Sequence, residues 1–190
     1  MGRKTIMRFA GISVLLLGVA TGSTATEPLR TVEHVDLERY MGRWYEIAAL
    51  PNFFQRHCVR DTTADYSLRE DGTVAVTNRC ETEDGEVDEA RGVARRAEAA
   101  AGAKLEVSFV DLLGMQLFWG DYWIIGLGAD YDFALVGTPS RRWGWILARE
   151  PRPSPQRIAS WLESLSGQGY DPAAFELSDQ SQRSTDDTGR

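Results

Sequence analysis

Residues Tyr40–Leu50 read YMGRWYEIAAL, and Gly42 lies two positions before Trp44 in this stretch. From Trp44 onward the composition is that of a β-strand, in which every second side chain lies on the same face. Trp44 and Glu46 therefore share a face. A bulky indole at the start of a strand needs a side chain that covers it, and the position of that partner in the sequence indicates how the strands are arranged.

Seven further segments have the composition of β-strands. Asp71-Gly72 joins two of them, and this dipeptide is a strong hairpin signal. No helical periodicity interrupts the series, which excludes the helical crossovers of a parallel sheet. We therefore expect an antiparallel meander, either a sandwich or an up-and-down barrel. The predicted strands are the one that begins at Trp44 and those at residues 62–70, 73–80, 87–96, 104–110, 121–128, 131–138 and 142–150.

One helix is predicted, and it follows all the strands. Ser154 is a suitable N-cap, Pro155 suits the first helical position, and Gly167 ends the pattern. These signals place the helix at about residues 155–167. Its apolar residues have the spacing that gives a helix one face to lay on a sheet: Ile158, Trp161, Leu162 and Leu165.

The two ends of the chain differ in character from the segment between them. In residues 1–25, three basic residues precede a short apolar run and then small residues, which is the order of a signal peptide. We predict an exported protein, periplasmic or secreted, whose domain spans residues 26–177. The polar residues 178–190 lack aromatic side chains and are predicted to be disordered.

The net charge and the two cysteines bear on the possible partners of the protein and on its covalent cross-links. Removal of the signal peptide takes away three positive charges, so the formal net charge changes from −7 to −10, which argues against nucleic acid as a partner. Because exported proteins meet an oxidising environment, the two cysteines, Cys58 and Cys80, favour a disulfide over two separate thiols. Neither lies in the predicted signal peptide, so we expect no N-terminal lipid anchor.

The last predicted strand supplies the partner for Trp44. By alternation Trp143, Trp145, Leu147 and Arg149 lie on one face of this strand. A guanidinium at the end of such an apolar row gains about 0.5–2 kcal/mol when it stacks on an indole. Closure of a barrel brings the first strand beside the last, so Arg149 is predicted to meet Trp44 at one end.

The stretches that carry these residues resemble the short conserved motifs of the lipocalins. They are Gly42, Trp44 and Tyr45 at the first strand, Asp121 and Tyr122 at the sixth, and Arg149 at the end of the eighth. The resemblance is closest to the bacterial lipocalins and their apolipoprotein D-like relatives, and it covers residues 35–177. It implies an all-β fold, an eight-stranded antiparallel up-and-down barrel with the C-terminal α-helix packed on the outside. In this fold Trp44 plugs the closed end of the cup and Arg149 covers its ring, so we interpret both as structural.

The same resemblance implies a carrier that holds a fatty acid or a lysophospholipid in its cavity, with a role in cell-envelope lipid maintenance or stress response. No catalytic residue, cofactor or metal is expected for such a carrier. Strand alternation predicts which side chains line the cavity wall. In the sixth strand alternation does not distinguish Trp123 from Tyr122, and we assign Trp123 to the wall. The predicted wall residues are Glu46, Tyr66, Val76, Leu105, Val107, Phe109, Trp123 and Trp145. Glu46 either contacts a head group or is satisfied at the wet mouth of the cup.

Two alternatives to a carrier stay open. One is a lipocalin-type enzyme, such as an isomerase, which needs a reactive group inside the cup. The other is an interaction module that uses the apolar connection at residues 110–120, which either packs on a neighbouring loop or forms a rim that touches membrane, ligand or a second subunit. His34 and His57 are far apart in the sequence, which disfavours a metal site. We expect a monomer or a weak dimer.

Overall fold

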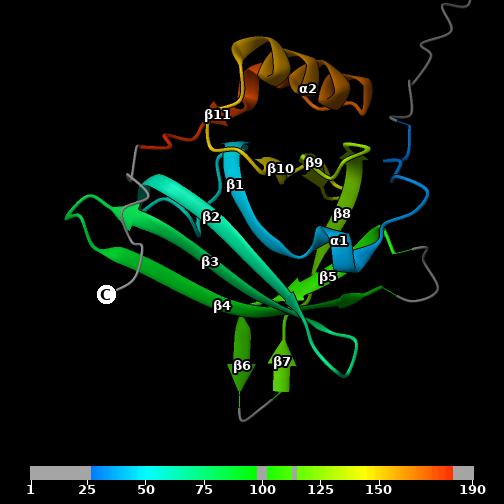
Figure 1. The fold of residues 1–190 in the computed structure, drawn as a ribbon, viewed down its shortest axis with the longest axis vertical. Helices are drawn as coiled ribbons and strands as arrows, with labels where there is room; N and C mark the ends of the chain where they lie inside the picture. Colours follow the sequence, from blue (N-terminus) through cyan, green and yellow to red (C-terminus); the bar gives the residue numbers. More distant parts are fainter. Residues whose placement is uncertain (1–26, 98–101, 113–114, 182–190) are drawn as a thin grey trace, which may run out of the picture.

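The computed structural model describes residues 27–97, 102–112 and 115–181. Eight strands form the barrel, and a helix follows them (Figure 1). In chain order the elements are α1 (Leu37–Tyr40), β1 (Gly42–Ala49), β2 (Cys58–Leu68), β3 (Val74–Thr82), β4 (Val87–Arg96), β5 (Lys104–Ser108), β6 (Val110–Leu112), β7 (Met115–Leu117), β8 (Gly120–Leu127), β9 (Phe133–Gly137), β10 (Gly144–Ala148), α2 (Pro155–Gly167), a 3₁₀ turn (Pro172–Ala174) and β11 (Glu176–Leu177).

The sheet is antiparallel and closed. Its order is β10-β9-β8-β5-β4-β3-β2-β1, and β1 also pairs with β10, so that the first barrel strand lies beside the last. Tyr45 is opposite Ala148 and Glu46 is opposite Leu147 in this closing pair. The predicted up-and-down barrel is confirmed. The connection between β5 and β8 forms a separate hairpin, β6–β7, which extends from the barrel (Figure 1).

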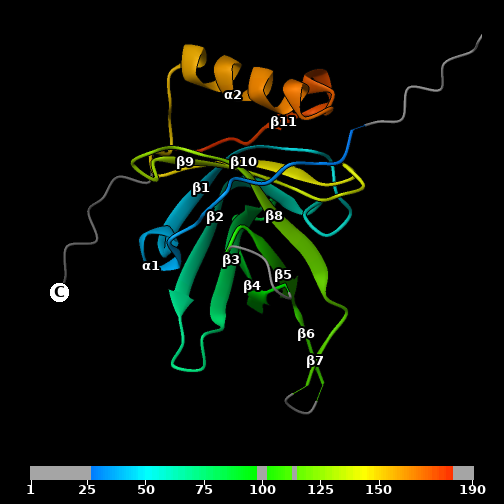
Figure 2. The same ribbon diagram turned by 90° about the vertical axis from the view of Figure 1, so that its right-hand side faces the viewer.

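Helix α2 packs on the outside of the barrel, as predicted, over β9 and β10 (Figure 2). Ser154 caps it by accepting a hydrogen bond from the Arg157 N–H, at 3.4 Å. On its apolar face Trp161 and Leu165 are buried, and the Trp161 ring stacks on Phe133 with centroids 5.0 Å apart. The barrel wall therefore has an apolar layer on each side, one toward the helix and one toward the interior.

Trp44 closes one end of the barrel. It is completely buried, and its Nε1 donates a hydrogen bond to the Tyr40 carbonyl oxygen, at 2.8 Å. The Arg149 guanidinium carbon lies 3.8 Å from the centroid of the indole ring, which is the predicted stack. Gly42 has φ +90°, a left-handed conformation that glycine adopts without strain, and this lets the chain turn from α1 into β1 beneath the indole.

The same guanidinium satisfies the backbone around the plug. It donates hydrogen bonds of 2.7–3.3 Å to the main-chain oxygens of Arg39, Tyr40, Met41, Arg43 and Tyr131. The first three of these lie at the end of α1, where a helix leaves carbonyl groups without partners in the helix itself. Arg149 thus joins the last strand of the barrel to the segment that precedes the first.

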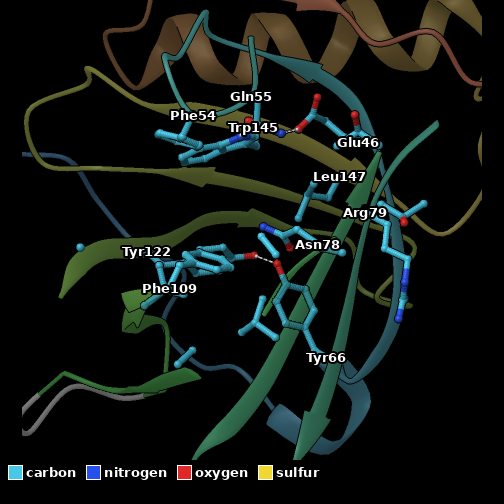
Figure 3. Close-up of a pocket in the computed structure, with 18 of the residues that line it drawn as sticks. Glu46, Phe54, Gln55, Tyr66, Asn78, Arg79, Phe109, Tyr122, Trp145 and Leu147 are labelled. Atoms are coloured by element: carbon cyan, nitrogen blue, oxygen red, sulfur yellow. Dashed lines mark hydrogen bonds between the residues drawn. The ribbon is translucent and has the colours of Figure 1, made fainter. Parts of the chain in front are cut away.

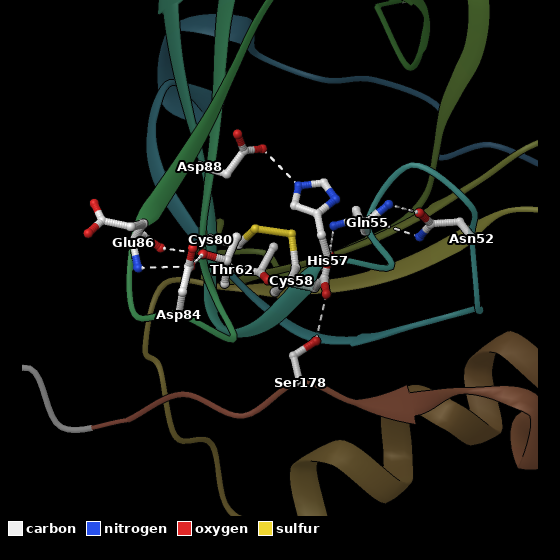
Figure 4. Close-up of a disulfide and its surroundings, with 12 residues drawn as sticks. Asn52, Gln55, His57, Cys58, Thr62, Cys80, Asp84, Glu86, Asp88 and Ser178 are labelled. Atoms are coloured by element: carbon white, nitrogen blue, oxygen red, sulfur yellow. Dashed lines mark hydrogen bonds and ion pairs between the residues drawn. A yellow bond between two sulfur atoms is a disulfide. The ribbon is translucent and has the colours of Figure 1, made fainter.

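The disulfide between Cys58 and Cys80 is present, as predicted, and links β2 to β3 with a Cα–Cα distance of 5.5 Å. The pairing of these strands is irregular next to it, with register shifts between Cys58 and Arg60 and between Arg60 and Thr63. The covalent bond holds the two strands together where their hydrogen-bond ladder is interrupted (Figure 4).

The prediction that residues 178–190 are disordered is wrong for its first four residues. Ser178 donates to the buried side chain of Glu46 at 2.6 Å, and Gln180 Nε2 donates to main-chain oxygens of β1 and β2 at 2.8 and 2.9 Å. A polar segment gives no hydrophobic pattern, but here its polar atoms complete the hydrogen bonds of two strands. Residues 182–190 and the predicted signal peptide, residues 1–25, lie outside the described residues. Within the described ranges, no helix is long and apolar enough to cross a membrane.

Replacing Arg149 with alanine is expected to lower the free energy of unfolding by about 1–3 kcal/mol, because the indole loses its cover and five carbonyl groups lose a donor. Denaturant titration of both proteins measures the change. Ligand affinity is expected to persist in the folded fraction. An unchanged stability together with a lost affinity would contradict the structural role of this arginine.

Removal of the disulfide is expected to cost about 3 kcal/mol, because it frees a loop of 22 residues in the unfolded chain. The double variant Cys58→Ser with Cys80→Ser tests this by thermal unfolding against the oxidised parent protein. As a check on the bond itself, alkylation of the native protein without reductant should label neither cysteine. Quantitative labelling of both would show that the bond does not form.

Candidate ligand-binding site

The barrel encloses a cavity of about 460 Å³ (Figure 3). Trp44 plugs the end at which β1 starts, and the connections at the other end of β1 and β10 form the mouth. Apolar and aromatic side chains from six of the eight barrel strands face the cavity, together with Glu46 of β1 and residues of the mouth loops. An apolar cup closed at one end is the form of a site for a small hydrophobic molecule.

Seven of the eight predicted wall residues line this cavity. They are Glu46, Tyr66, Val76, Leu105, Val107, Phe109 and Trp145. All seven side chains lie on the cavity wall, whereas their contact with a ligand remains a prediction. The sequence also missed wall residues that the structure shows, among them Tyr40, Asn78 and Leu147.

The prediction for Trp123 is wrong. Its ring packs in the layer outside the barrel, and Lys104 Nζ lies 4.1 Å from the ring centroid. Tyr122, which was assigned only to a structural motif, faces the cavity instead. The segment from Asp121 to Gly128 is almost continuously apolar, so the sequence contains no alternation from which the two faces of β8 could be distinguished.

Three tyrosines form the floor of the cavity, above the plug. The hydroxyl of Tyr122 is 2.8 Å from that of Tyr40 and 3.0 Å from that of Tyr66, and the Tyr40 ring lies 4.9 Å from the Trp44 ring. Burial raises the pKa of Tyr66 to about 12 and raises the pKa values of Tyr40 and Tyr122 well above 10.0. The floor is therefore neutral near pH 7, with its hydroxyl groups bonded to one another.

Glu46 is a buried carboxylate on the wall between floor and mouth. Its side-chain oxygens accept hydrogen bonds from Ser178 Oγ at 2.6 Å and from Gln55 Nε2 at 2.9 Å. Burial raises the pKa of Glu46 above 4.5, and these two hydrogen bonds offset part of that increase. Among the described residues no cationic side chain forms an ion pair with it.

Aromatic side chains surround the mouth. Phe54 lies 5.4 Å from Trp143 and 6.4 Å from Trp145, measured between ring centroids. Gln55 ties this group to the wall, because its Oε1 accepts from Trp145 Nε1 at 3.3 Å while its Nε2 donates to Glu46. Figure 3 shows Phe54, Gln55, Trp145 and Glu46 together at one end of the cavity.

The model of the lipocalin-like domain matches residues 35–180, which is most of the chain. The protein belongs to the lipocalin family. Temperature-induced lipocalin-1 of Arabidopsis thaliana is 36% identical over 161 residues, which cover 83% of this chain and 86% of the relative. The outer membrane lipoprotein Blc of Escherichia coli K12 is 34% identical over 167 residues, which cover 87% and 91%.

A solved structure supports the same fold. Insecticyanin from the tobacco hornworm Manduca sexta matches this lipocalin with a TM-score of 0.67 over 83% of the chain and 87% of its own, at 19% identity. At that identity the likeness concerns the fold alone. The family predicted from Trp44, Tyr122 and Arg149 is confirmed, and the match to Blc agrees with its bacterial branch.

One cluster in this lipocalin has the residue types of a metal site. Ligand atoms of His57, Cys58 and Cys80 lie within 4.8 Å of one another near the mouth (Figure 4). Both sulfurs are joined in the disulfide, which removes the thiolates that zinc binds. His57 is paired instead with Asp88, at 2.8 Å.

In the apolar connection at residues 110–120, most of the residues whose burial the structure describes are exposed. Trp119 is covered by Arg95, whose guanidinium carbon lies 3.9 Å from the ring centroid. The exposed residues are Val110, Leu112, Met115 and Phe118, and Phe118 is 83% exposed. Packing on Arg95 therefore accounts for Trp119, whereas the exposed side chains of Val110, Leu112, Met115 and Phe118 form an apolar rim beside the mouth.

The raised pKa of Glu46 predicts a specific pH dependence of stability. Between pH 4.5 and the folded pKa the native state holds more protons than the unfolded chain, so the free energy of unfolding falls as the pH rises through this interval. Glu46→Gln lacks this titration and is expected to gain stability relative to the wild type as the pH increases. Denaturant titrations of both proteins across this interval measure the difference, and parallel curves would contradict it.

Proposed function

We propose that this lipocalin is a carrier that binds a single-chain amphiphile, a fatty acid or a lysophospholipid, without transforming it. The observation that carries the proposal is the cavity of about 460 Å³, lined mainly by apolar and aromatic side chains and closed by Trp44. Sites for small ligands typically measure about 300–1,000 Å³ and combine such walls with a few polar groups. Here the polar groups include Glu46, Asn78 and the tyrosine floor.

The dimensions favour one chain over two. An eight-stranded barrel holds one small ligand, and a second acyl chain needs width that such a barrel does not offer. Each buried methylene group contributes about 0.8 kcal/mol, so a partly inserted chain reaches micromolar affinity, about 8 kcal/mol.

The proposed role is in cell-envelope lipid maintenance or stress response. The names of the two relatives, a temperature-induced lipocalin and an outer membrane lipoprotein, support a role of this kind. We propose an exported protein, periplasmic or secreted, that acts as a monomer or a weak dimer. The exposed apolar side chains of Leu112, Met115 and Phe118 in the connection at residues 110–120 support peripheral contact with a membrane.

The alternative of an enzyme receives little support from the groups in the cup. Cys58 and Cys80 are bonded to each other, so neither offers a thiolate. The three tyrosines of the floor have raised pKa values and donate and accept among themselves. The alternative of an interaction module is favoured by one observation, the exposed side chains of Leu112, Met115 and Phe118.

A titration with lysophospholipids of increasing chain length tests the carrier function. Trp143 and Trp145 line the cavity, so their emission should shift when a chain enters. Affinity is expected to rise with chain length and then to level off when the cup is full, and two-chain phospholipids should bind far more weakly. If the tryptophan emission of folded, delipidated protein does not change for any chain length, the carrier proposal is contradicted and the interaction module is favoured.

Two matched variants show whether the response comes from the cavity. Val107 lines the cavity, whereas Val87 lies on the neighbouring strand β4, outside the cavity lining, and is 51% exposed. Val107→Glu should weaken binding by at least about tenfold, because a carboxylate then lies in the path of the chain. Val87→Glu introduces the same charge and should leave the affinity unchanged. An equal loss of affinity in both variants would show that the ligand binds to the protein surface and not in the cavity.

A further inference from the structure

The charges around the cavity discriminate between possible head groups. The charged or titratable residues that line it are Glu46, His57, Arg79, Asp88 and Asp121, apart from the tyrosines and the bonded cysteines. Arg79 is the one residue of this set that is always cationic. Its guanidinium is already engaged by Asp65 and Glu89, each at 2.7 Å, and these two carboxylates also pair with Arg43 and Arg91.

We therefore expect the carboxylate of a fatty acid to bind weakly in this cavity. Among the described lining residues it finds no cation without a carboxylate partner, since His57 is also paired, with Asp88. It would instead share the cup with the buried Glu46. Two carboxylates in a site of low polarity repel each other, and burying an unpaired charge is costly. Arg56 and Arg142 are exposed residues of the mouth loops and do not line the cavity.

A cation would meet complementary groups at the mouth end of the cavity. The buried Glu46 carboxyl group is hydrogen-bonded yet has no cationic partner among the described residues, and a cation beside it favours its ionised form. The rings of Phe54 and Trp145 supply π faces, and Gln55 links Trp145 to Glu46 through its two side-chain atoms. Aromatic faces combined with a carboxylate are the groups that bind ammonium and quaternary ammonium ions.

We propose that this lipocalin selects single-chain amphiphiles with a cationic head group, an ammonium or a quaternary ammonium, which is bound by Glu46 and the rings of Phe54 and Trp145. The inference rests on the proposed carrier function and narrows it. The chain lies against the apolar wall formed by Val76, Leu105 and Val107. The cationic head group acts as the counter-ion of Glu46, and the chain of the same ligand covers the apolar wall.

Three amphiphiles with the same chain and different heads test the selection: dodecyltrimethylammonium, dodecanol and dodecanoate, each below its micelle concentration. Affinity and stoichiometry are measured by calorimetry at pH 7. One-to-one binding is expected, with the cation bound at least about tenfold more tightly than the carboxylate and the alcohol in between; tenfold corresponds to about 1.4 kcal/mol.

Charge variants separate the site from the general attraction of an acidic protein for a cation. Glu46→Gln should reduce the ratio between cation and carboxylate to about threefold or less. Glu163→Gln removes the same charge from the exposed face of α2 and should keep the wild-type ratio. If Glu46→Gln does not fold, Phe54→Leu in the exposed mouth loop should lower the affinity for the cation by a larger factor than the affinity for the alcohol, and an equal loss for both would overturn the role of this ring.

The outcomes distinguish this inference from the carrier function on which it rests. If none of the three amphiphiles binds to folded, delipidated protein, the carrier function itself is wrong. If all three bind and the carboxylate binds as tightly as the cation, the cationic selection is overturned and the carrier stands. If Glu46→Gln and Glu163→Gln change the ratio equally, the preference belongs to the net charge and the assignment to Glu46 is overturned.

Discussion

The stacking of Arg149 on Trp44 is the interaction on which the cup depends. It closes the barrel at one end, and the guanidinium ties the residue after β10 to five backbone carbonyl groups in α1, the start of β1 and the β8–β9 connection. Without that plug the tyrosine floor would have no support, since the Tyr40 ring packs directly on the indole. The position of an arginine and a tryptophan about a hundred residues apart thus determines that the interior is a closed pocket and not a channel.

Strand β1 carries both ends of the site. Because alternate residues of a strand share a face, Trp44 at the plug and Glu46 on the wall both point inward. Beyond Tyr45 this strand no longer pairs with β2, and the C-terminal segment completes the wall there. Gln180 bridges the Glu46 and Thr62 carbonyl oxygens, while Ser178 holds the Glu46 side chain. The hydrogen-bonded environment of Glu46 is therefore formed by three parts of the chain, namely β1, the loop that contains Gln55 and the C-terminal segment.

The fold was predictable from the sequence because its signals are local or pairwise: alternation, the Asp71-Gly72 turn, the helix caps and the Trp44–Arg149 pair. The site was predictable where alternation is clear, as in the segment with Leu105 and Val107. It was not predictable in β8, whose continuous apolar run hides which face Trp123 occupies. The ordered residues 178–181 gave no signal either, since their order comes from hydrogen bonds to strands more than a hundred positions earlier.

The central claim is that the closed apolar cup holds one single-chain amphiphile. Native mass spectrometry of the protein purified from its own cells, without detergent, tests it most directly. The account predicts a population heavier than the polypeptide by one small molecule, which is released on unfolding and identified as a single-chain lipid. A protein that is consistently free of any bound small molecule, or that carries a two-chain lipid or a partner protein in its place, would contradict the account.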